Sequence, residues 1–333
     1  MDTAEAGHVD IDWVRVPVPA AEMSRLNRRS DFKGLVQALG HLGILACTGT
    51  AAFYSAARWP WWVTVALTYL HGICWAFILN GFHELCHGTV FRTKALNAFF
   101  LRVYSFLGQY NYVHFQESHR RHHKYTLHPP ADLEVTLPIK MSLRNFLLYQ
   151  FVNLRGIIDH PKGLWRSARG KITGKWNERI LPATAPTRRP EYIRWARIVL
   201  VGHTVLVAVS LYFGLWMIPI LVTCAPLYGT WLRFLCNETQ HVGLRDNVPD
   251  FRLCCRTFTL NPFVRFLYWQ MNYHIEHHMY AGIPCYNLGK FHRLIKDQLP
   301  PSPHGLMALW KSIIPILKQQ ARDPSYQYTA PLP

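Results

Sequence analysis

Three runs of residues without Asp, Glu, Lys or Arg most strongly limit the folds open to this chain. They cover residues 35–57, 59–82 and 198–232, and Arg58 alone separates the first two. A helix needs about 20 apolar residues to cross a bilayer. Each of the first two runs is long enough for one crossing, and the third is long enough for two. The chain is therefore predicted to be an all-α integral membrane protein.

The number of crossings in the third run decides where the histidine clusters lie. Such clusters occur within residues 83–123, before this run, and within residues 274–278, after it. One crossing would place them on opposite sides of the membrane, whereas two crossings with a turn near Gly214 place them on the same side. Lys and Arg are scarce near Arg58 and Gly214, which indicates that the other connections are cytoplasmic. We predict four transmembrane helices as two hairpins, with a cytosolic helical cap that holds the histidine clusters.

The predicted organisation is a single membrane domain. Its segments are a cytosolic arm (1–34), four spans (35–57, 59–82, 195–213 and 215–235), a cap in two parts (83–194 and 236–323) and a loose tail (324–333). The first 33 residues lack a compact apolar stretch, so a cleaved signal peptide is not expected. The predicted location is a multi-pass membrane protein with a cytosolic active site, in the endoplasmic reticulum of a eukaryote or the inner membrane of a bacterium.

The charge and the cysteine content limit the partners and metal sites that we expect for this protein. The formal net charge of +17 could indicate a nucleic-acid partner. The positive residues lie between the apolar spans, however, so we assign the charge to membrane topology and expect a lipid bilayer and no nucleic acid. The eight cysteines form no CxxC pair, and we expect reduced thiols without a metal-binding half-site.

The histidine clusters predict a metal centre. Each cluster spaces its histidines three or four residues apart, which places them on one face if the segment is helical. The clusters are His83 and His87; His119, His122 and His123; and His274, His277 and His278. Eight imidazoles exceed the needs of one four-coordinate ion, so two metals are predicted, and a nitrogen-rich set without thiolate favours iron over structural zinc. A ninth candidate is His241, one helical turn after Asn237.

The order and spacing of these clusters, HxxxH, HxxHH and HxxHH, resemble the three histidine boxes of the membrane fatty acid desaturase and hydroxylase superfamily. The resemblance covers roughly residues 35–300. It implies a non-haem di-iron centre that uses O2 to take hydrogen from an unactivated C–H bond of a fatty acyl or lipid-like alkyl chain. The pair Asn237 and His241 resembles an element of acyl-CoA desaturases that adds a ninth histidine ligand and a water-linked asparagine. The implied ligands are His83, His87, His119, His122, His123, His241, His274, His277 and His278, with Asn237 acting through a water.

Other roles are predicted around this centre. Asp132 and Glu134 follow the second box and Glu276 lies inside the third, where carboxylates could orient the imidazoles. No substrate-binding residue is identified. The chain has neither a haem-binding HPGG motif nor a Gly-rich flavin or nicotinamide fingerprint. The resemblance therefore implies a separate external reductant, either a cytochrome b5-like or a ferredoxin-like protein.

Several alternatives stay open at the level of sequence. Hydroxylation, epoxidation and acetylenic bond formation begin with the same hydrogen abstraction as desaturation. His83-Glu84-xx-His87 also matches the HExxH signature of an intramembrane zinc protease, although that function leaves six box histidines unexplained. A non-catalytic scaffold with a structural metal would unfold when a box histidine is replaced. The substrate carrier also stays open among acyl-CoA, carrier protein, intact lipid, sphingoid base and specialised metabolite.

Overall fold

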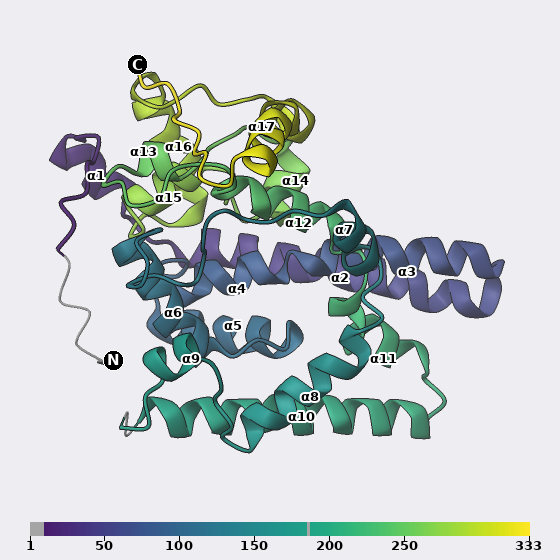
Figure 1. Ribbon diagram of the computed structural model, residues 1–333. Coiled ribbons are helices and arrows are strands. Elements are labelled where there is room, and N and C mark those ends of the chain that lie inside the picture. Colours follow the sequence, from purple (N-terminus) through teal and green to yellow (C-terminus); the bar gives the residue numbers. More distant parts are fainter. Residues whose placement is uncertain (1–9, 185–186) are drawn as a thin grey trace.

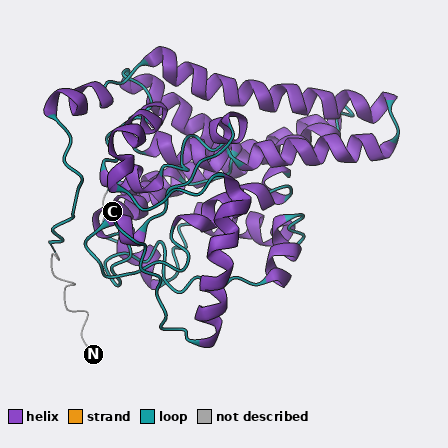
Figure 2. Cartoon of the chain, turned by 90° about the horizontal axis from the view of Figure 1, so that it is seen from above, coloured by secondary structure: helices purple, strands orange, loops and turns teal. Residues whose placement is uncertain are grey.

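The chain folds into helices joined by loops and turns. The computed structural model describes residues 10–184 and 187–333. Within these residues the extended segments form isolated β-bridges, such as Thr257 with Tyr273, and Figure 2 shows no strand there. The all-α class predicted from the sequence is therefore confirmed.

Three helices in the described part of the chain are long and apolar enough to cross a membrane. They are α2 (Asp31–Arg58), the joined helices α3 (Trp61–Ala76) and α4 (Ile78–Cys86), and α10 (Arg188–Tyr212). These helices overlap three of the four predicted spans. Figure 1 shows α2 and α3 side by side as a hairpin that projects from the rest of the molecule.

The fourth predicted span, 215–235, is not one continuous helix. The chain turns at Gly214, as predicted, and then forms α11 (Met217–Val222), η1 (Ala225–Leu227) and α12 (Trp231–Asn237). Pro226 has no backbone N–H to continue the helical hydrogen bonding of α11, and Tyr228 is extended with φ −142° and ψ 156°. The apolar run therefore forms short helices, some of which pack against α3. Non-helical backbone at membrane depth is tolerated where protein covers it.

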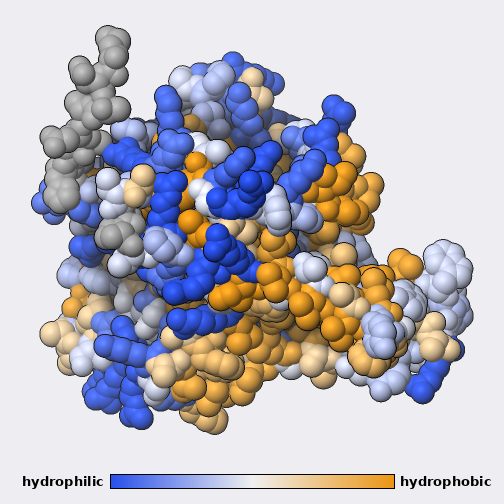
Figure 3. Space-filling model, turned by 90° about the horizontal axis from the view of Figure 1, so that it is seen from below, coloured by the Kyte–Doolittle hydropathy of each residue, from blue (hydrophilic) through white to orange (hydrophobic). Residues whose placement is uncertain are grey.

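An apolar surface follows α10 and its neighbour α8 (Gly156–Ala168), which pack against each other. On α10 the exposed apolar side chains recur every three or four residues: Ile198, Val201, Val205 and Val209. Ile157 and Trp165 of α8 are also exposed. Figure 3 shows a broad hydrophobic area on this side of the molecule. A contiguous apolar surface of this kind marks contact with a membrane or a partner, and together with the apolar helices it identifies a membrane protein.

The remaining helices lie before α10 and after α12 in the chain. Before α10 these are α1 (Ala20–Leu26), α5 (Lys94–Leu107), α6 (Tyr112–Tyr125), α7 (Leu143–Gln150) and α9 (Lys175–Ile180). After α12 they are η2 (Glu238–Gln240), α13 (Phe251–Cys254), α14 (Pro262–Leu267), α15 (His274–Met279), α16 (Cys285–Ile295), η3 (Lys296–Gln298) and α17 (Gly305–Arg322). The side chain of Asn111 caps α6 by accepting hydrogen bonds from the backbone N–H groups of Val113 and His114. This cap defines where the helix carrying the second histidine cluster begins.

Both ends of the described chain contact the body of the protein. In the N-terminal arm, the Val14 N–H donates to Pro249 O at 2.8 Å. Residues 1–9 of the predicted arm lie outside the described residues. In the tail, the Tyr328 N–H donates to Gly243 O at 2.9 Å, and Gln327 Nε2 donates to Asp246 Oδ1 at 2.6 Å. Residues 324–333, expected to be a loose tail, are therefore held against the loop that follows His241.

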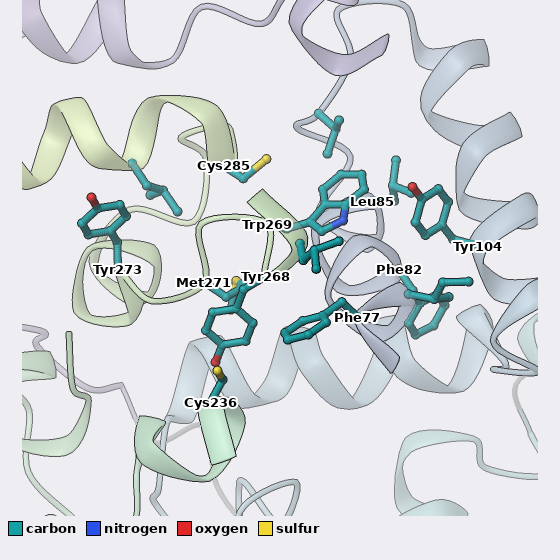
Figure 4. Close-up of a cluster of buried hydrophobic side chains, with 14 of the residues drawn as sticks. Phe77, Phe82, Leu85, Tyr104, Cys236, Tyr268, Trp269, Met271, Tyr273 and Cys285 are labelled. Atoms are coloured by element: carbon teal, nitrogen blue, oxygen red, sulfur yellow. The ribbon is translucent and has the colours of Figure 1, made fainter. Parts of the chain in front are cut away.

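A buried aromatic cluster joins the membrane helices to the segment before α15. Figure 4 shows Phe77, Phe82, Tyr104 and Trp269 among its members. Trp269 Nε1 donates to a ring nitrogen of His41 at 3.1 Å, which ties this segment to α2. The core therefore holds the third histidine cluster against the first.

Gly81 is a point of close approach between helix and aromatic rings in this core. A Cβ atom there would lie 2.4 Å from Tyr104 and 2.7 Å from Trp269. We expect Gly81→Val to lower the free energy of unfolding by about 1–3 kcal/mol or more, because both rings would have to move in a close-packed core. The measurement is the thermal unfolding midpoint in detergent. Gly43→Val is the matched control, since no atom lies within 4 Å of its added Cβ, and equal midpoints for the two variants would contradict the prediction.

Candidate metal centre

The first group of histidines comes from three helices. His83 lies on α4 and His87 directly follows it, His119 and His123 lie one turn apart on α6, and His277 lies on α15. One ring nitrogen from each of these five residues lies within 4.8 Å of the others. The packing of α4 and α6, together with the aromatic core beneath α15, brings residues almost 200 positions apart into one cluster.

The second group lies beside the first. One ring nitrogen each from His241, His274 and His278 and the sulfur of Cys255 lie within 4.8 Å of one another. The ring of His122 is next to this group, with its centroid 5.2 Å from that of His241 and 4.9 Å from that of His278. The structure thus gathers all nine predicted histidines, and it divides them into two groups, which spacing alone could not do.

Two carboxylates after α6 orient histidines of the second box. His122 Nδ1 donates to Asp132 Oδ2 at 2.8 Å, and His119 Nδ1 donates to Glu134 Oε1 at 2.6 Å. A carboxylate on Nδ1 fixes the ring and leaves Nε2 free for a metal. The sequence predicted this role for both Asp132 and Glu134, which follow the second box.

Glu84 acts in the same way on the first box. Its Oε1 accepts a hydrogen bond from His83 Nδ1 at 3.1 Å and lies 3.5 Å from His277 Nδ1. Glu84 is fully buried. The HExxH glutamate therefore contacts imidazoles of two boxes, and the zinc-protease alternative would leave the other histidines around it unexplained.

Glu276 does not contact a histidine of either group through its described hydrogen bonds. It accepts hydrogen bonds from His292 Nδ1 on α16 and from Thr257 Oγ1. Because it is two residues from His274 and one from His277, it lies on a different face of α15. The prediction that Glu276 orients a metal-binding imidazole is therefore corrected: Glu276 ties α15 to its surroundings.

Asn237 lies at the end of α12. Its Oδ1 accepts a hydrogen bond from Asn80 Nδ2 at 3.2 Å, so it connects α12 with α4. The water-linked role of Asn237 stays a prediction.

The buried imidazoles are held neutral, which is the form that binds a metal. Burial, helped by neighbouring histidines, holds the pKa of His119, His123, His274, His277 and His278 well below its usual range. It lowers the pKa of His87 and of His241 to about 3. His122 is different. Burial alone would lower its pKa, but the hydrogen bond and charge of Asp132 outweigh burial and raise it.

Several ring nitrogens in the two groups have no hydrogen-bond partner although they are buried. They are His87 Nε2, His123 Nδ1, His274 Nδ1, both nitrogens of His277, and His278 Nε2. Each unpaired buried polar atom costs about 1–3 kcal/mol. The unpaired nitrogens, together with the convergence of the histidines, the neutral rings and the supporting carboxylates, fit the binding of metal ions.

A polar cavity of about 440 Å³ opens onto the first group. Its lining includes His87, His119 and His123 together with Arg120 and Arg188. Both arginines pair with the carboxylate of Glu117, at 2.7 and 2.8 Å. The first group is therefore reachable from a charged surface rather than sealed in the core.

Fold and site together define an all-helical membrane protein with buried histidine groups that could bind metal. The family model described as fatty acid desaturase matches residues 59–310, a range that includes all nine histidines. The chain belongs to the fatty acid desaturase family, and this membership implies an oxidoreductase. A comparison with curated proteins finds no match.

Proposed function

We propose that the chain is an O2-dependent di-iron oxidoreductase of the membrane that desaturates a fatty acyl or lipid-like alkyl chain. The observation that carries this proposal is the convergence of nine histidines into two adjoining groups in a member of the desaturase family. Five imidazoles in one group and four around the other suit two ions rather than one.

The proposed ligands divide as the two groups do. One iron is assigned to His83, His87, His119, His123 and His277, and the other to His122, His241, His274 and His278, with Asn237 acting through a water. Two irons bound there would supply the oxidant that takes hydrogen from an unactivated C–H bond. Asp132, Glu134 and Glu84 hold the imidazole rings in place.

The balance of the reaction requires an outside reductant. Removing two hydrogens from the substrate and reducing O2 to two waters consumes two further electrons and two protons. We propose a separate cytochrome b5-like or ferredoxin-like donor. The cavity beside the first group carries Arg120 and Arg188 against the single carboxylate of Glu117, and this net positive charge would attract an acidic donor protein.

We also propose the membrane arrangement predicted from the sequence. In it, α11 to α12 return the chain after α10, so that both termini and all histidine groups share the cytosolic side. The scarcity of Lys and Arg in the turns near Arg58 and Gly214, compared with the other connections, supports this orientation. The membrane would be the endoplasmic reticulum or a bacterial inner membrane.

Mass spectrometry of a reconstituted reaction tests the proposed function. Purified protein is supplied with iron, O2, an electron donor and candidate acyl substrates. We expect iron-dependent loss of two hydrogens from the substrate and two irons per chain by metal analysis. Gain of one oxygen would instead identify a hydroxylase or epoxidase on the same scaffold. A single bound zinc with peptide cleavage would overturn the oxidoreductase and support the protease.

A further inference from the structure

Cys255 places a sulfur atom inside the second group of histidines. Its Sγ and one ring nitrogen each from His241, His274 and His278 lie within 4.8 Å of one another, and all four side chains are buried. Donor atoms bound to one ion at 2.0–2.3 Å lie about 3–4.5 Å apart, depending on the coordination number. The observed group can therefore close onto an ion by small side-chain movements.

Contacts on one side of Cys255 tie its neighbours to the loop that carries His241. His241 Nδ1 donates to Cys254 O at 2.8 Å. Arg256 Nη1 donates to Thr239 O at 2.6 Å and to Val242 O at 3.1 Å, which are carbonyls on either side of His241. The residues before and after Cys255 are thus both bound to the His241 loop.

Contacts on the other side tie the same segment to α15. Thr257 Oγ1 donates to the carboxylate of Glu276 and accepts a hydrogen bond from the Ile275 N–H at 3.2 Å. Thr257 also forms a β-bridge with Tyr273, directly before the third box. Cys255 is therefore held between the two elements that supply the histidines of this group, and its position does not depend on a flexible loop.

We propose that Cys255 binds, as a thiolate, the metal ion that we assign to His122, His241, His274 and His278. On binding, the S–H bond breaks, the sulfur–metal bond forms and the proton leaves to solvent, without transfer of electrons. This inference rests on the proposed metal-dependent function. A thiolate is a softer ligand than imidazole, so the two ions would sit in chemically different sites, one with nitrogen donors and one with nitrogen and sulfur.

Cobalt(II) binding to the full-length protein in detergent tests this ligand. The metal-free protein is titrated with Co²⁺, and the readouts are the cobalt-to-protein ratio, the sulfur-to-cobalt charge-transfer absorption and the sulfur shell in X-ray absorption. Cys255→Ser is compared with Cys254→Ser, whose sulfur lies only 3.9 Å from that of Cys255 in the native chain. The thermal unfolding midpoint checks that each variant is folded.

We expect the charge-transfer band and a sulfur neighbour at about 2.3 Å in the native protein and in Cys254→Ser. Cys255→Ser should lose both signals. A band that persists in Cys255→Ser, or no band in a native protein that binds two cobalt ions, overturns the sulfur ligand but leaves the di-metal function standing. Cobalt binding that is absent, or that is unchanged by His274→Ala, overturns both. Because the native protein itself must show the band, the test does not depend on the folding of one variant.

Discussion

Replacing His278 with alanine is expected to abolish turnover and to lower the iron content from two ions per chain to one or fewer. The ring of His278 stacks on His123 with centroids 4.3 Å apart and lies 4.4 Å from His274, so it stands where the two groups meet. Its Nδ1 donates to Thr126 Oγ1 at 3.1 Å, which leaves Nε2 for a metal. Product formation and metal analysis of the purified variant measure the effect.

The matched control for His278→Ala is His304→Ala, at an exposed position outside both groups. We expect the control to retain turnover and iron. Full turnover with normal iron content in His278→Ala would show that His278 is not a metal ligand. The thermal unfolding midpoint distinguishes the proposed enzyme from a non-catalytic scaffold with a structural metal. In a scaffold, His278→Ala should unfold the protein. In the proposed enzyme, His278→Ala should lose activity while the protein stays folded.

The second large effect is expected at Asp132. The carboxylate is completely buried, and both of its oxygens accept hydrogen bonds: Oδ2 from His122 Nδ1 at 2.8 Å and from the Leu127 N–H at 2.9 Å, and Oδ1 from the Glu134 N–H at 2.9 Å. Asparagine has the same shape but only one oxygen. In Asp132→Asn an NH2 group must therefore face one of these donors.

We expect Asp132→Asn to lower iron affinity about 10–100-fold, because a carboxylate that orients a metal-binding imidazole supports binding to that extent. The unpaired donor should also destabilise the fold by about 1–3 kcal/mol. Competition with a chelator measures the affinity, and thermal unfolding measures the stability. Asp159→Asn, at an exposed position on α8, is the control. Iron affinity equal to that of the control would show that Asp132 does not support the centre.

The helical face that each histidine cluster occupies could be read from the sequence, because spacings of three and four residues put side chains on one face of a helix. The same rule explains why Glu276 was misassigned. It lies among box histidines in sequence but, at one and two residues from them, on another face of α15, where it meets His292. Sequence proximity indicated a shared site, and helix geometry separated the side chains.

For the membrane segments too, the sequence predicted one part of the structure and packing decided another. Absence of charge over long runs was enough to predict α2, α3 with α4, and α10, because each is long and apolar enough to span a bilayer. The hydropathy of residues 215–235 does not predict the break between α11 and α12. That break depends on Pro226 and on the packing of the broken segment against α3, which is a contact between residues about 150 positions apart.

By itself, the sequence determined the class of protein: apolar runs specify a membrane fold, and repeated histidine spacings specify a metal-binding family. Only the tertiary structure decided which imidazoles share a group, that Glu84 supports them, and that Cys255 enters the second group. The physical reason is that the spacing of residues along the chain predicts only which side chains share a face of the same helix. A metal site is built where several elements meet, and their meeting is set by packing in the core around Trp269 and Tyr104.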